Sequence, residues 1–356
     1  MVREVPEPSL RPGEVLVRTA VSTISSGTET LILRKSALPD ARDEEYPGER
    51  FEYPIIRSGV RLDAPLPRPP LPGLISLGYS LAGQVVATSD GVTDLEKGDW
   101  VACSGSQCAH HAEMVAVPRN LLAKVPEGVS PGQAAFVTLG AISVEALRRT
   151  RCKFGETIAL YGLGLLGLLA TQIARSAGFR ILGLDIDERR LATARELGAS
   201  ATCNPSSEDP RISAKAMTDG LGVDAVILAV VTESSEPLNL SFELCRQRGC
   251  VVGVGVFGMN IDRARMGYAD YRMAVAYGPG RYDPVYEEGN VDYPIGYVRW
   301  TENRNMTHFL RLLAEGHVDV ASLSPIQIPI ERAPEAYELL GSADRPPTVQ
   351  LTYGEA

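Results

Sequence analysis

The stretch Thr157-Ile158-Ala159-Leu160-Tyr161-Gly162-Leu163-Gly164-Leu165-Leu166-Gly167 decides the fold of this chain. Its first five residues predict a short buried strand, and the apolar run from Leu165 to Ala177 predicts the helix that follows. A Gly-x-Gly-x-x-Gly pattern alone is a weak indicator. Here it joins a strand to a helix, which is the context that the pattern requires, so we expect the turn to bind phosphate groups.

Each glycine of this turn has its own task. Gly162 permits the tight turn, Gly164 lets the backbone approach a pyrophosphate, and Gly167 lets the helix pack closely on the strand. The turn amides then face the phosphates at the positive end of the helix dipole. The residues predicted to bind a dinucleotide in this way are Gly162, Leu163, Gly164, Leu165 and Leu166. The alternative is a glycine-rich turn that packs a helix on a sheet without a ligand.

An acidic residue in the right register favours the dinucleotide. Asp185 follows the next predicted strand, close to the ~20-residue spacing of a ribose-binding carboxylate. Its carboxylate would accept hydrogen bonds from both ribose hydroxyls and would repel a 2′-phosphate, which favours NAD over NADP. Arg190 either reaches the adenosine ribose or is a solvated helix arginine. The other predicted cofactor contacts lie beside Asp185 or near the ends of two later strands: Ile186, Val230, Val254, Gly255 and Val256.

Two kinds of pattern divide the chain, whose 356 residues favour two domains. Short strands such as Glu14 to Val21 are separated by turns in the first third, whereas strands alternate with helices from about Pro131. We therefore expect an α/β protein in which a β-rich domain precedes a doubly wound parallel sheet. The segment from Pro39 to Pro72 is predicted to be a long irregular excursion, and Val318 to Tyr353 could complete either domain.

Composition excludes several classes of protein. Hydrophobic residues make up 44% and charged residues 22%, as in ordinary globular proteins, and a net charge of −9 argues against a nucleic-acid partner. The N-terminus has no apolar leader, and the most apolar stretch is short for a membrane span and interrupted by glycines, so we expect a cytoplasmic protein without a membrane partner. Six scattered cysteines predict free thiols rather than a disulfide framework.

The order of motifs resembles the medium-chain dehydrogenase/reductase superfamily. The matching segments include Leu77 to Gly83, Val92 to Val101, Val115 to Pro118 and Arg190 to Ala199. The resemblance implies a GroES-like catalytic domain, residues 1–131 completed by 317–356, a Rossmann domain, residues 132–316, and a homodimer or homotetramer. More narrowly, Ser25 to Glu29 and the run from Tyr277 to Asn305 resemble a branch that is often fused to a second oxidoreductase domain, which we expect this chain to lack.

This sequence departs from the zinc-binding members of the family. At the first two ligand positions it has Ser26 (or Ser25) and Tyr79, Ser80 replaces a glutamate, and Thr138 to Ala141 provides no third ligand. Neutral hydroxyls are poor zinc ligands, because open catalytic sites use three of Cys, His, Asp and Glu. We therefore predict no catalytic zinc. The one alternative metal cluster is Cys103, Cys108, His110 and His111. For these residues, packing of small side chains and a surface turn are favoured over a metal site.

Side chains must then do the chemistry that zinc does elsewhere. Hydride transfer to a carbonyl needs a group that stabilises the developing negative charge and delivers a proton. Tyr79 can donate from its phenol, Thr28 matches the proton-relay hydroxyl of the family, and Glu29 lies next to it. These three are the predicted catalytic residues. Alternatively, Tyr79 fills the void left by the metal, and Glu29 caps or pairs structurally, which is favoured.

The run from Tyr277 to Asn305 concentrates aromatic and charged residues. Rings stack on sugar faces and guanidinium groups bind carboxylate or phosphate, so the run suits a polar small-molecule substrate. A subunit interface explains it equally well. The predicted substrate contacts are Ser26, Arg281, Tyr282, Tyr297 and Arg299.

Three hypotheses for function follow. The first is a zinc-independent, NAD-dependent dehydrogenase that acts on a secondary alcohol or ketone of a sugar, cyclitol or amino derivative. The second is a zinc-free reductase of an activated double bond or an imine, commonly dependent on NADPH, against which Asp185 counts. The third is a nucleotide-binding sensor or assembly protein that has lost catalysis.

Overall fold

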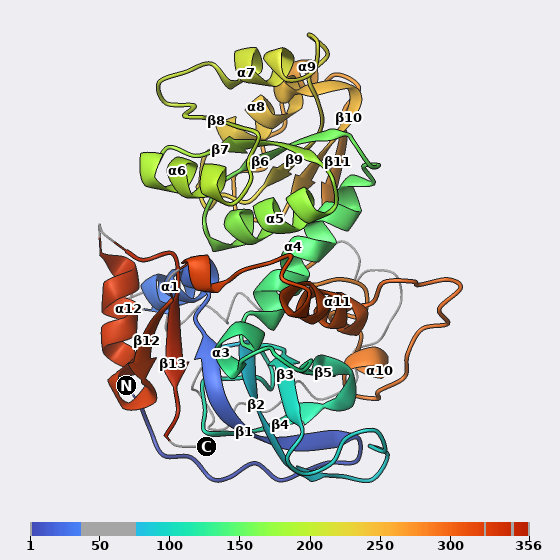
Figure 1. Cartoon of the computed structure of the whole chain (residues 1–356), viewed down its shortest axis with the longest axis vertical. Coiled ribbons are helices and arrows are strands. Elements are labelled where there is room, and N and C mark those ends of the chain that lie inside the picture. The colour runs from blue at the N-terminus through green and yellow to red at the C-terminus, as the bar shows by residue number, and fades with distance from the viewer. Residues whose placement is uncertain (1, 37–75, 324, 343–344, 355–356) are drawn as a thin grey trace.

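The computed structural model describes residues 2–36, 76–323, 325–342 and 345–354. The excursion predicted from Pro39 to Pro72 lies outside these residues. The described chain forms two sheets, one above the other in Figure 1, and helix α4 (Val137–Thr150) runs from one to the other. None of the helices in the described residues has both the length and the apolar character needed to cross a membrane.

The first sheet has seven strands in the order β12-β13-β1-β2-β3-β5, with β4 paired to β1. Its pairs are antiparallel except for the parallel pair β12 and β13. Because β13 pairs with β1, the carboxyl-terminal strands complete this sheet rather than the second one. The strands are β1 (Glu14–Thr23), β2 (Ser80–Thr88), β3 (Trp100–Ser104), β4 (Met114–Pro118), β5 (Leu122–Lys124), β12 (Ile326–Pro329) and β13 (Val349–Thr352).

The second sheet has six parallel strands in the order β11-β10-β9-β6-β7-β8. Strand β6 lies between β7 and β9, so the strand order reverses there, and ligands bind at such switch points in open parallel sheets. This confirms the predicted doubly wound parallel sheet. The strands are β6 (Thr157–Tyr161), β7 (Arg180–Leu184), β8 (Ala201–Cys203), β9 (Val223–Leu228), β10 (Cys245–Gly253) and β11 (Asp270–Met273).

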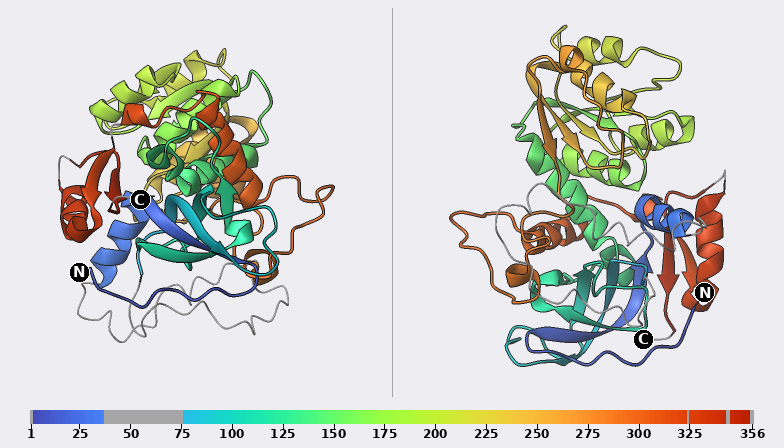
Figure 2. Two further views of the ribbon diagram at one scale, coloured as in Figure 1. Left: turned by 60° about the horizontal axis from the view of Figure 1, so that its bottom comes forward. Right: turned by 180° about the vertical axis from the view of Figure 1, so that it is seen from behind.

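Helices cover both sheets. Around the second sheet lie α5 (Leu165–Ser176), α6 (Glu188–Glu196), α7 (Pro210–Ala216), α8 (Glu236–Leu244) and α9 (Arg263–Met266). With the first sheet lie α1 (Ser26–Ser36), α3 (Pro131–Ala134), α10 (Pro284–Glu287), α11 (Glu302–Ala314) and α12 (Ala333–Gly341), as both panels of Figure 2 show. Short 3₁₀ turns span Arg119–Leu121, Ala321–Leu323 and Ile330–Arg332.

The chain returns to the first sheet earlier than the boundary predicted at residue 316. Arg281 donates to Gln107 Oε1 at 3.1 Å, and Asn120 Nδ2 donates to the Tyr286 carbonyl at 2.8 Å. Helix α11 packs on α4 and β5. From about residue 277 onward, the chain therefore contacts the first sheet instead of the second, and α11 covers the first sheet.

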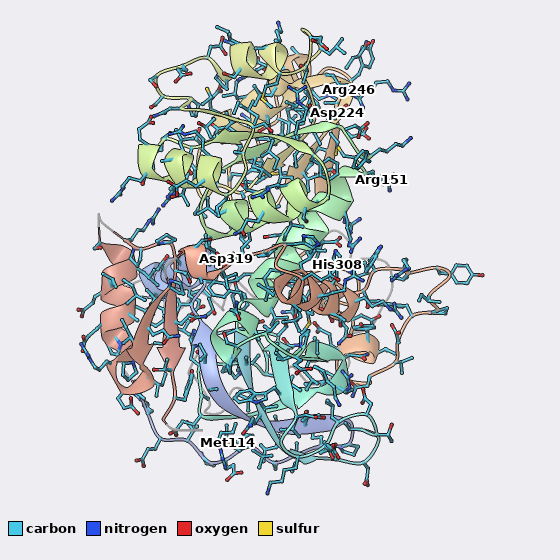
Figure 3. All side chains as sticks on the ribbon, in the orientation of Figure 1. Met114, Arg151, Asp224, Arg246, His308 and Asp319 are labelled. Atoms are coloured by element: carbon cyan, nitrogen blue, oxygen red, sulfur yellow. The ribbon has the colours of Figure 1, made fainter. Side chains whose placement is uncertain are left out.

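Polar contacts link strands of the second sheet to one another and link its helix α5 to the returning chain. Asp224 accepts from Arg246 Nε at 2.6 Å and from the Thr157 backbone N–H at 2.8 Å, where the register of β10 shifts. Asp319 lies between the two sheets in Figure 3, and its backbone N–H donates to Gln172 Oε1 of α5 at 2.7 Å. The returning segment is therefore bonded to the helix that follows the glycine turn.

Candidate active site

The glycine turn has the geometry that a phosphate-binding turn needs. Gly162 has a φ of 98°, and a Cβ there would lie 2.7 Å from the Ala229 carbonyl oxygen. A Cβ at Gly167 would lie 2.1 Å from the Gly162 carbonyl oxygen, whereas a Cβ at Gly164 would meet no atom within 4 Å. Two glycines are thus required by packing within the protein. The space beside Gly164, the N-cap of α5, is open to a ligand.

Asp185 is fixed to this turn. Its Oδ2 accepts from the Leu163 backbone N–H at 2.7 Å, and its Oδ1 accepts from the Asp187 backbone N–H at 3.0 Å. Arg190 lies against it, with 3.5 Å between Nη1 and Oδ2. Each carboxylate oxygen has two lone pairs. Oδ2 faces both Leu163 and Arg190, so Oδ1 is the oxygen that can accept one more hydrogen bond.

Exposed apolar side chains flank the turn. Ile186, next to Asp185, is 71% exposed, and Val231 and Val256 are more than half exposed beyond the ends of β9 and β10. The Val256 backbone N–H donates to the Val230 carbonyl at 3.1 Å, and Val231 and Val256 form a parallel bridge. Burial of such surface is favourable. These residues, with the open Gly164 and the fixed Asp185, fit a dinucleotide.

Val254 and Gly255 complete this end of the sheet. Val254 is partly buried against the core, and a Cβ at Gly255 would lie 2.0 Å from the Val230 carbonyl oxygen. Gly255 therefore allows two backbones to approach closely. Leu163 and Leu165 are buried, and Leu166 packs against the same core. These three can contribute backbone amides at the turn while their side chains hold α5 on the sheet.

The first turn of α1 brings the predicted catalytic residues to the second sheet. A Cβ at Gly27 would lie 3.7 Å from Val231 Cγ2, so this turn lies beside the end of β9. Ser25 and Thr28 hydrogen-bond through their side chains to Tyr79. Thr28 is exposed, whereas Ser26 and Tyr79 are partly exposed. The structure thus brings together a phenol and two aliphatic hydroxyls.

The environment of Tyr79 disfavours the phenolate. Burial is the largest cause that raises the pKa of Tyr79, to about 12, and the negative charge of Glu29 acts in the same direction. The hydrogen bonds with Ser25 and Thr28 oppose this rise. Tyr79 is therefore a hydrogen-bond donor throughout the neutral pH range.

Glu29 makes structural hydrogen bonds instead of facing Thr28. It is 1% exposed, and its Oε1 accepts from the Ser25 backbone N–H at 2.8 Å. Its Oε2 contacts His111 Nε2 at 3.0 Å and accepts from the Tyr337 hydroxyl at 2.6 Å. This agrees with the capping and pairing alternative for Glu29. Sequence reasoning missed both His111 and Tyr337 as its partners, which lie far away along the chain.

The residues that align with zinc ligands form a hydroxyl-lined site. Ser80 Oγ donates to the Ala135 carbonyl at 2.7 Å and accepts from the Thr138 backbone N–H at 3.1 Å. Thr138 Oγ1 donates to the Tyr79 carbonyl at 2.8 Å. Ser80 and Thr138 thus bond within the protein, and Ser25, Ser26 and Tyr79 offer neutral hydroxyls. This donor set does not fit zinc.

The alternative metal cluster is divided by the fold. Cys103 and Cys108 are buried, and Cys108 Sγ donates to the Ser104 carbonyl at 3.4 Å. Burial lowers the pKa of His110 to about 4, and His111 pairs with Glu29. Within the described ranges no three His, Cys, Asp or Glu side chains gather as a metal site. All six cysteines are free thiols.

Two of the predicted substrate residues lie near Tyr79. Tyr282 is 44% exposed, has a φ of 68°, and lies close enough to interact electrostatically with Tyr79. The Arg281 guanidinium lies 4.1 Å from the centre of the Tyr282 ring and pairs with Glu287 Oε1 at 2.6 Å. It also donates to Ser106 Oγ at 2.9 Å. Arg281 therefore supports Tyr282 and is already paired within the protein.

The structure does not bring the other two substrate residues to Tyr79. Tyr297 is 92% exposed on the segment between α10 and α11, which projects from the body at the right of Figure 1. Arg299 lies on the same segment, with its guanidinium 3.9 Å from the centre of the Trp300 ring, which also contacts Arg148 of α4. Sequence reasoning could not separate these residues from Tyr282, because it does not reveal how the segment folds.

Comparisons with known proteins agree with this fold. The family model for an alcohol dehydrogenase GroES-like domain matches residues 11–127, and that for a zinc-binding dehydrogenase matches residues 166–282. An alcohol dehydrogenase of Geobacillus stearothermophilus is 24% identical over 284 residues, covering 72% of this chain and 73% of the relative.

Solved structures show the same architecture over nearly the whole chain. An alcohol dehydrogenase from Thermus sp. ATN1 has a TM-score of 0.73 at 25% identity, covering 99% of this chain and 96% of that chain. A galactitol-1-phosphate dehydrogenase from Escherichia coli has a TM-score of 0.75 at 18% identity over the same shares, which shows a common fold. With two family models matched in order, this chain belongs to the medium-chain dehydrogenase/reductase superfamily and is an oxidoreductase of the alcohol dehydrogenase type.

Proposed function

We propose that this chain is an NAD(H)-dependent oxidoreductase that interconverts a secondary alcohol and a ketone of a polar metabolite without a catalytic zinc. The observation that carries the proposal is the meeting of Tyr79 with Ser25 and Thr28 beside Val231, at the end of β9. A phenol that donates a hydrogen bond lies where zinc-dependent members of the family hold their metal.

The cofactor part rests on the turn and on Asp185. When bound, NADH supplies the hydride. The amides of the turn would hold the pyrophosphate at the start of α5, and Asp185 would accept from the ribose hydroxyls. The exposed side chain of Ile186 would offer an apolar surface to the adenine, and those of Val231 and Val256 would offer one to the nicotinamide. A carboxylate at the ribose repels a 2′-phosphate, which supports NAD over NADP.

The proton part rests on Tyr79 and Thr28. Reduction of a ketone places negative charge on its oxygen, and a preorganised donor stabilises that charge. Tyr79 donates a hydrogen bond to this oxygen and then transfers its proton. Thr28 contacts the phenol and is exposed, so its hydroxyl can return a proton from solvent. Oxidation of the alcohol follows the same path in reverse.

The substrate class rests on Tyr282. Its ring is partly exposed and is supported from behind by Arg281. An aromatic face of this kind suits a sugar or cyclitol ring, and its nearness to Tyr79 supports a role beside the reacting carbon.

The first test is cofactor binding. Titration with the protein is expected to change the fluorescence of NADH. At a hundredfold excess of NADH over its Kd, binding should stabilise the folded protein by about 2.7 kcal/mol and so raise the melting temperature. Asp185→Ala should weaken NADH binding about tenfold or more and leave NADPH binding unchanged, because it removes the ribose acceptor and the repulsion together. No binding of either dinucleotide at about 1 mM overturns the proposal.

The second test is Tyr79→Phe, assayed on a panel of secondary alcohols with NAD. We expect kcat to fall about a hundredfold or more while NADH affinity is unchanged, since the phenol ring is retained. Tyr268→Phe, which changes an exposed phenol in the turn before β11, is the matched control. Full activity of Tyr79→Phe contradicts the catalytic role of Tyr79, whereas loss of wild-type activity on prolonged chelation contradicts the zinc-free assignment.

A further inference from the structure

Behind Tyr79 lies a buried carboxylate that connects three segments of the chain. Glu29, on α1, accepts from the Ser25 backbone N–H, contacts His111 just before β4, and accepts from the Tyr337 hydroxyl on α12. In sequence, His111 is 82 residues away and Tyr337 is 308 residues away. Figure 1 shows α1 and α12 side by side, and the two helices are in contact.

The network continues to the last strand. His111 Nδ1 lies 2.7 Å from Ser22 Oγ, and Ser22 Oγ lies 2.8 Å from the hydroxyl of Tyr353, which directly follows β13. Because a carboxylate only accepts hydrogen bonds, His111 Nε2 is the donor to Glu29. His111 and Ser22 therefore connect Glu29 to Tyr353 at the end of the chain's last strand.

This arrangement closes the turn that carries the hydroxyls. Glu29 Oε1 accepts from the Ser25 N–H at 2.8 Å, and the Glu29 N–H donates to the Ser25 carbonyl at 2.9 Å. The side chains of Ser25 and Thr28, from the same turn, hydrogen-bond to Tyr79. Movement of Glu29 would consequently move both hydroxyls that hold the phenol.

We propose that Glu29 is a positioning residue for Tyr79, which holds the hydroxyl-bearing turn in place and keeps the phenol in its donor form, with His111 and Tyr337 as its supports. The inference rests on the proposed function of Tyr79. It goes beyond that function by making the carboxyl-terminal helix α12 part of the active-site architecture.

Groups on several elements bear on this positioning. The pKa of Tyr79 is raised by Glu29 on α1 and by Tyr282 on the segment before α10. Of these two groups, only Glu29 is a carboxylate. On its other side, Glu29 faces His111 and Tyr337, with Tyr353 behind Ser22. The charge of Glu29 raises the pKa of Tyr79, so its removal lowers that pKa.

The experiment measures the ionisation of Tyr79 directly. The ultraviolet phenolate absorbance of the protein is titrated with base, and the titration of a matched Tyr79→Phe protein is subtracted, so that no substrate is needed. Glu29→Gln is expected to move the Tyr79 midpoint down by about half a pH unit to one unit. In the alcohol panel, its kcat should fall about tenfold while the Kd of NADH is unchanged.

Further variants separate the effect of the Glu29 charge from the effect of its side-chain length. Glu29→Asp keeps the charge but is too short for the Ser25 N–H, so kcat should fall while the Tyr79 midpoint stays within about 0.3 units. Tyr337→Phe provides a milder change that removes one support, and kcat should fall several-fold. Glu145→Gln is the matched control. It neutralises another buried carboxylate, paired with Arg149 on α4, and should change neither readout.

The outcomes distinguish the two proposals. If Tyr79→Phe is inactive but Glu29→Gln and Tyr337→Phe both keep the wild-type kcat, and the Tyr79 midpoint does not move in Glu29→Gln, the positioning role is overturned. If Tyr79→Phe is fully active, the proposed role of Tyr79 fails instead.

Discussion

Glu302 is fully buried at the start of α11, and neither of its carboxylate oxygens has a hydrogen-bond partner among the described residues. Burial raises the pKa of Glu302 well above its usual value, the charge of Glu287 acts in the same direction, and Arg281 opposes them. Arg281 pairs with Glu287, whose side chain is also buried. At the residue scale, Arg281 thus bonds directly to Glu287, while burial disfavours the charged form of Glu302.

This arrangement predicts a pH-dependent stability. A carboxyl group whose folded pKa is raised contributes stability that is fully present below the unfolded pKa, about 4.3, and is lost as the pH rises toward the folded pKa. Glu302→Gln removes this loss of stability at higher pH, because glutamine does not ionise. The free energy of unfolding of the variant, relative to wild type, should therefore increase by about 1 kcal/mol or more between about pH 5 and pH 8 in urea melts. Glu287→Gln should instead destabilise, since it leaves Arg281 unpaired.

At the scale of elements, β6, the glycine turn and α5 form one unit, in which each glycine meets a different structural requirement. Gly162 and Gly167 are required by backbone atoms of the protein itself, whereas Gly164 faces open space. A sequence motif treats the three alike. The structure distinguishes the glycines that serve the fold from the one that serves a ligand.

Two matched substitutions test this distinction. Gly167→Ala would place a Cβ against the Gly162 carbonyl and should destabilise the protein by about 1–3 kcal/mol. Gly164→Ala should lower the free energy of unfolding by less than about 1 kcal/mol, because it replaces a favoured N-cap residue without a clash. It should weaken NADH binding about tenfold or more, because its methyl group would occupy the pyrophosphate space. Equal melting temperatures for the two variants, or unchanged NADH affinity of Gly164→Ala, would contradict this assignment.

At the scale of the whole molecule, α4 joins the two sheets, and α11 packs against it. Buried side chains from both sheets belong to one continuous core that includes Phe136 and Leu139 of this region and Phe309 of α11. The site lies where these sheets meet, since Gly27 of one approaches Val231 of the other. Its geometry therefore depends on how the two sheets are held together.

A substitution at the helix contact tests this dependence. A Cβ at Gly140 of α4 would lie 2.2 Å from Phe309 Cδ2, and Phe309 is fully buried. Gly140→Ala should lower the free energy of unfolding by about 1–3 kcal/mol and reduce kcat with little change in NADH affinity, because the glycine turn lies elsewhere. Gly296→Ala, at an exposed position with no atom near the added Cβ, is the control. Wild-type stability of Gly140→Ala would contradict the close contact.

Local patterns were enough to predict the glycine turn and the position of Asp185 beside it. Strand, glycine turn, helix and Asp185 follow one another within about thirty residues, so their geometry depends on βαβ packing that recurs in many proteins. The structure added Val231, one residue beyond the predicted Val230. The exposed end of β9 is the signal that could have identified it.

The catalytic half depended on contacts between distant segments. Thr28 and Tyr79 were predicted only through a family resemblance, and Ser25 only as an alternative position for a zinc ligand. Ser25 and Thr28 hydrogen-bond to Tyr79, about fifty residues away along the chain. His111 and Tyr337 carry no local signal that they bind Glu29. The order of arginines and aromatics after Tyr277 likewise could not show that Tyr282 comes near Tyr79 while Tyr297 projects into solvent.

The sequence by itself determined the doubly wound sheet, the phosphate turn and the lack of zinc-type ligands at the aligned positions, because periodicity, glycine geometry and ligand chemistry act over a few residues. Only the tertiary structure decided that Glu29 is a buried support, that the last strands complete the first sheet, and that α11 covers it. Such contacts join residues up to about three hundred positions apart. Their free energy depends on shape and burial in the folded state, which local patterns do not encode.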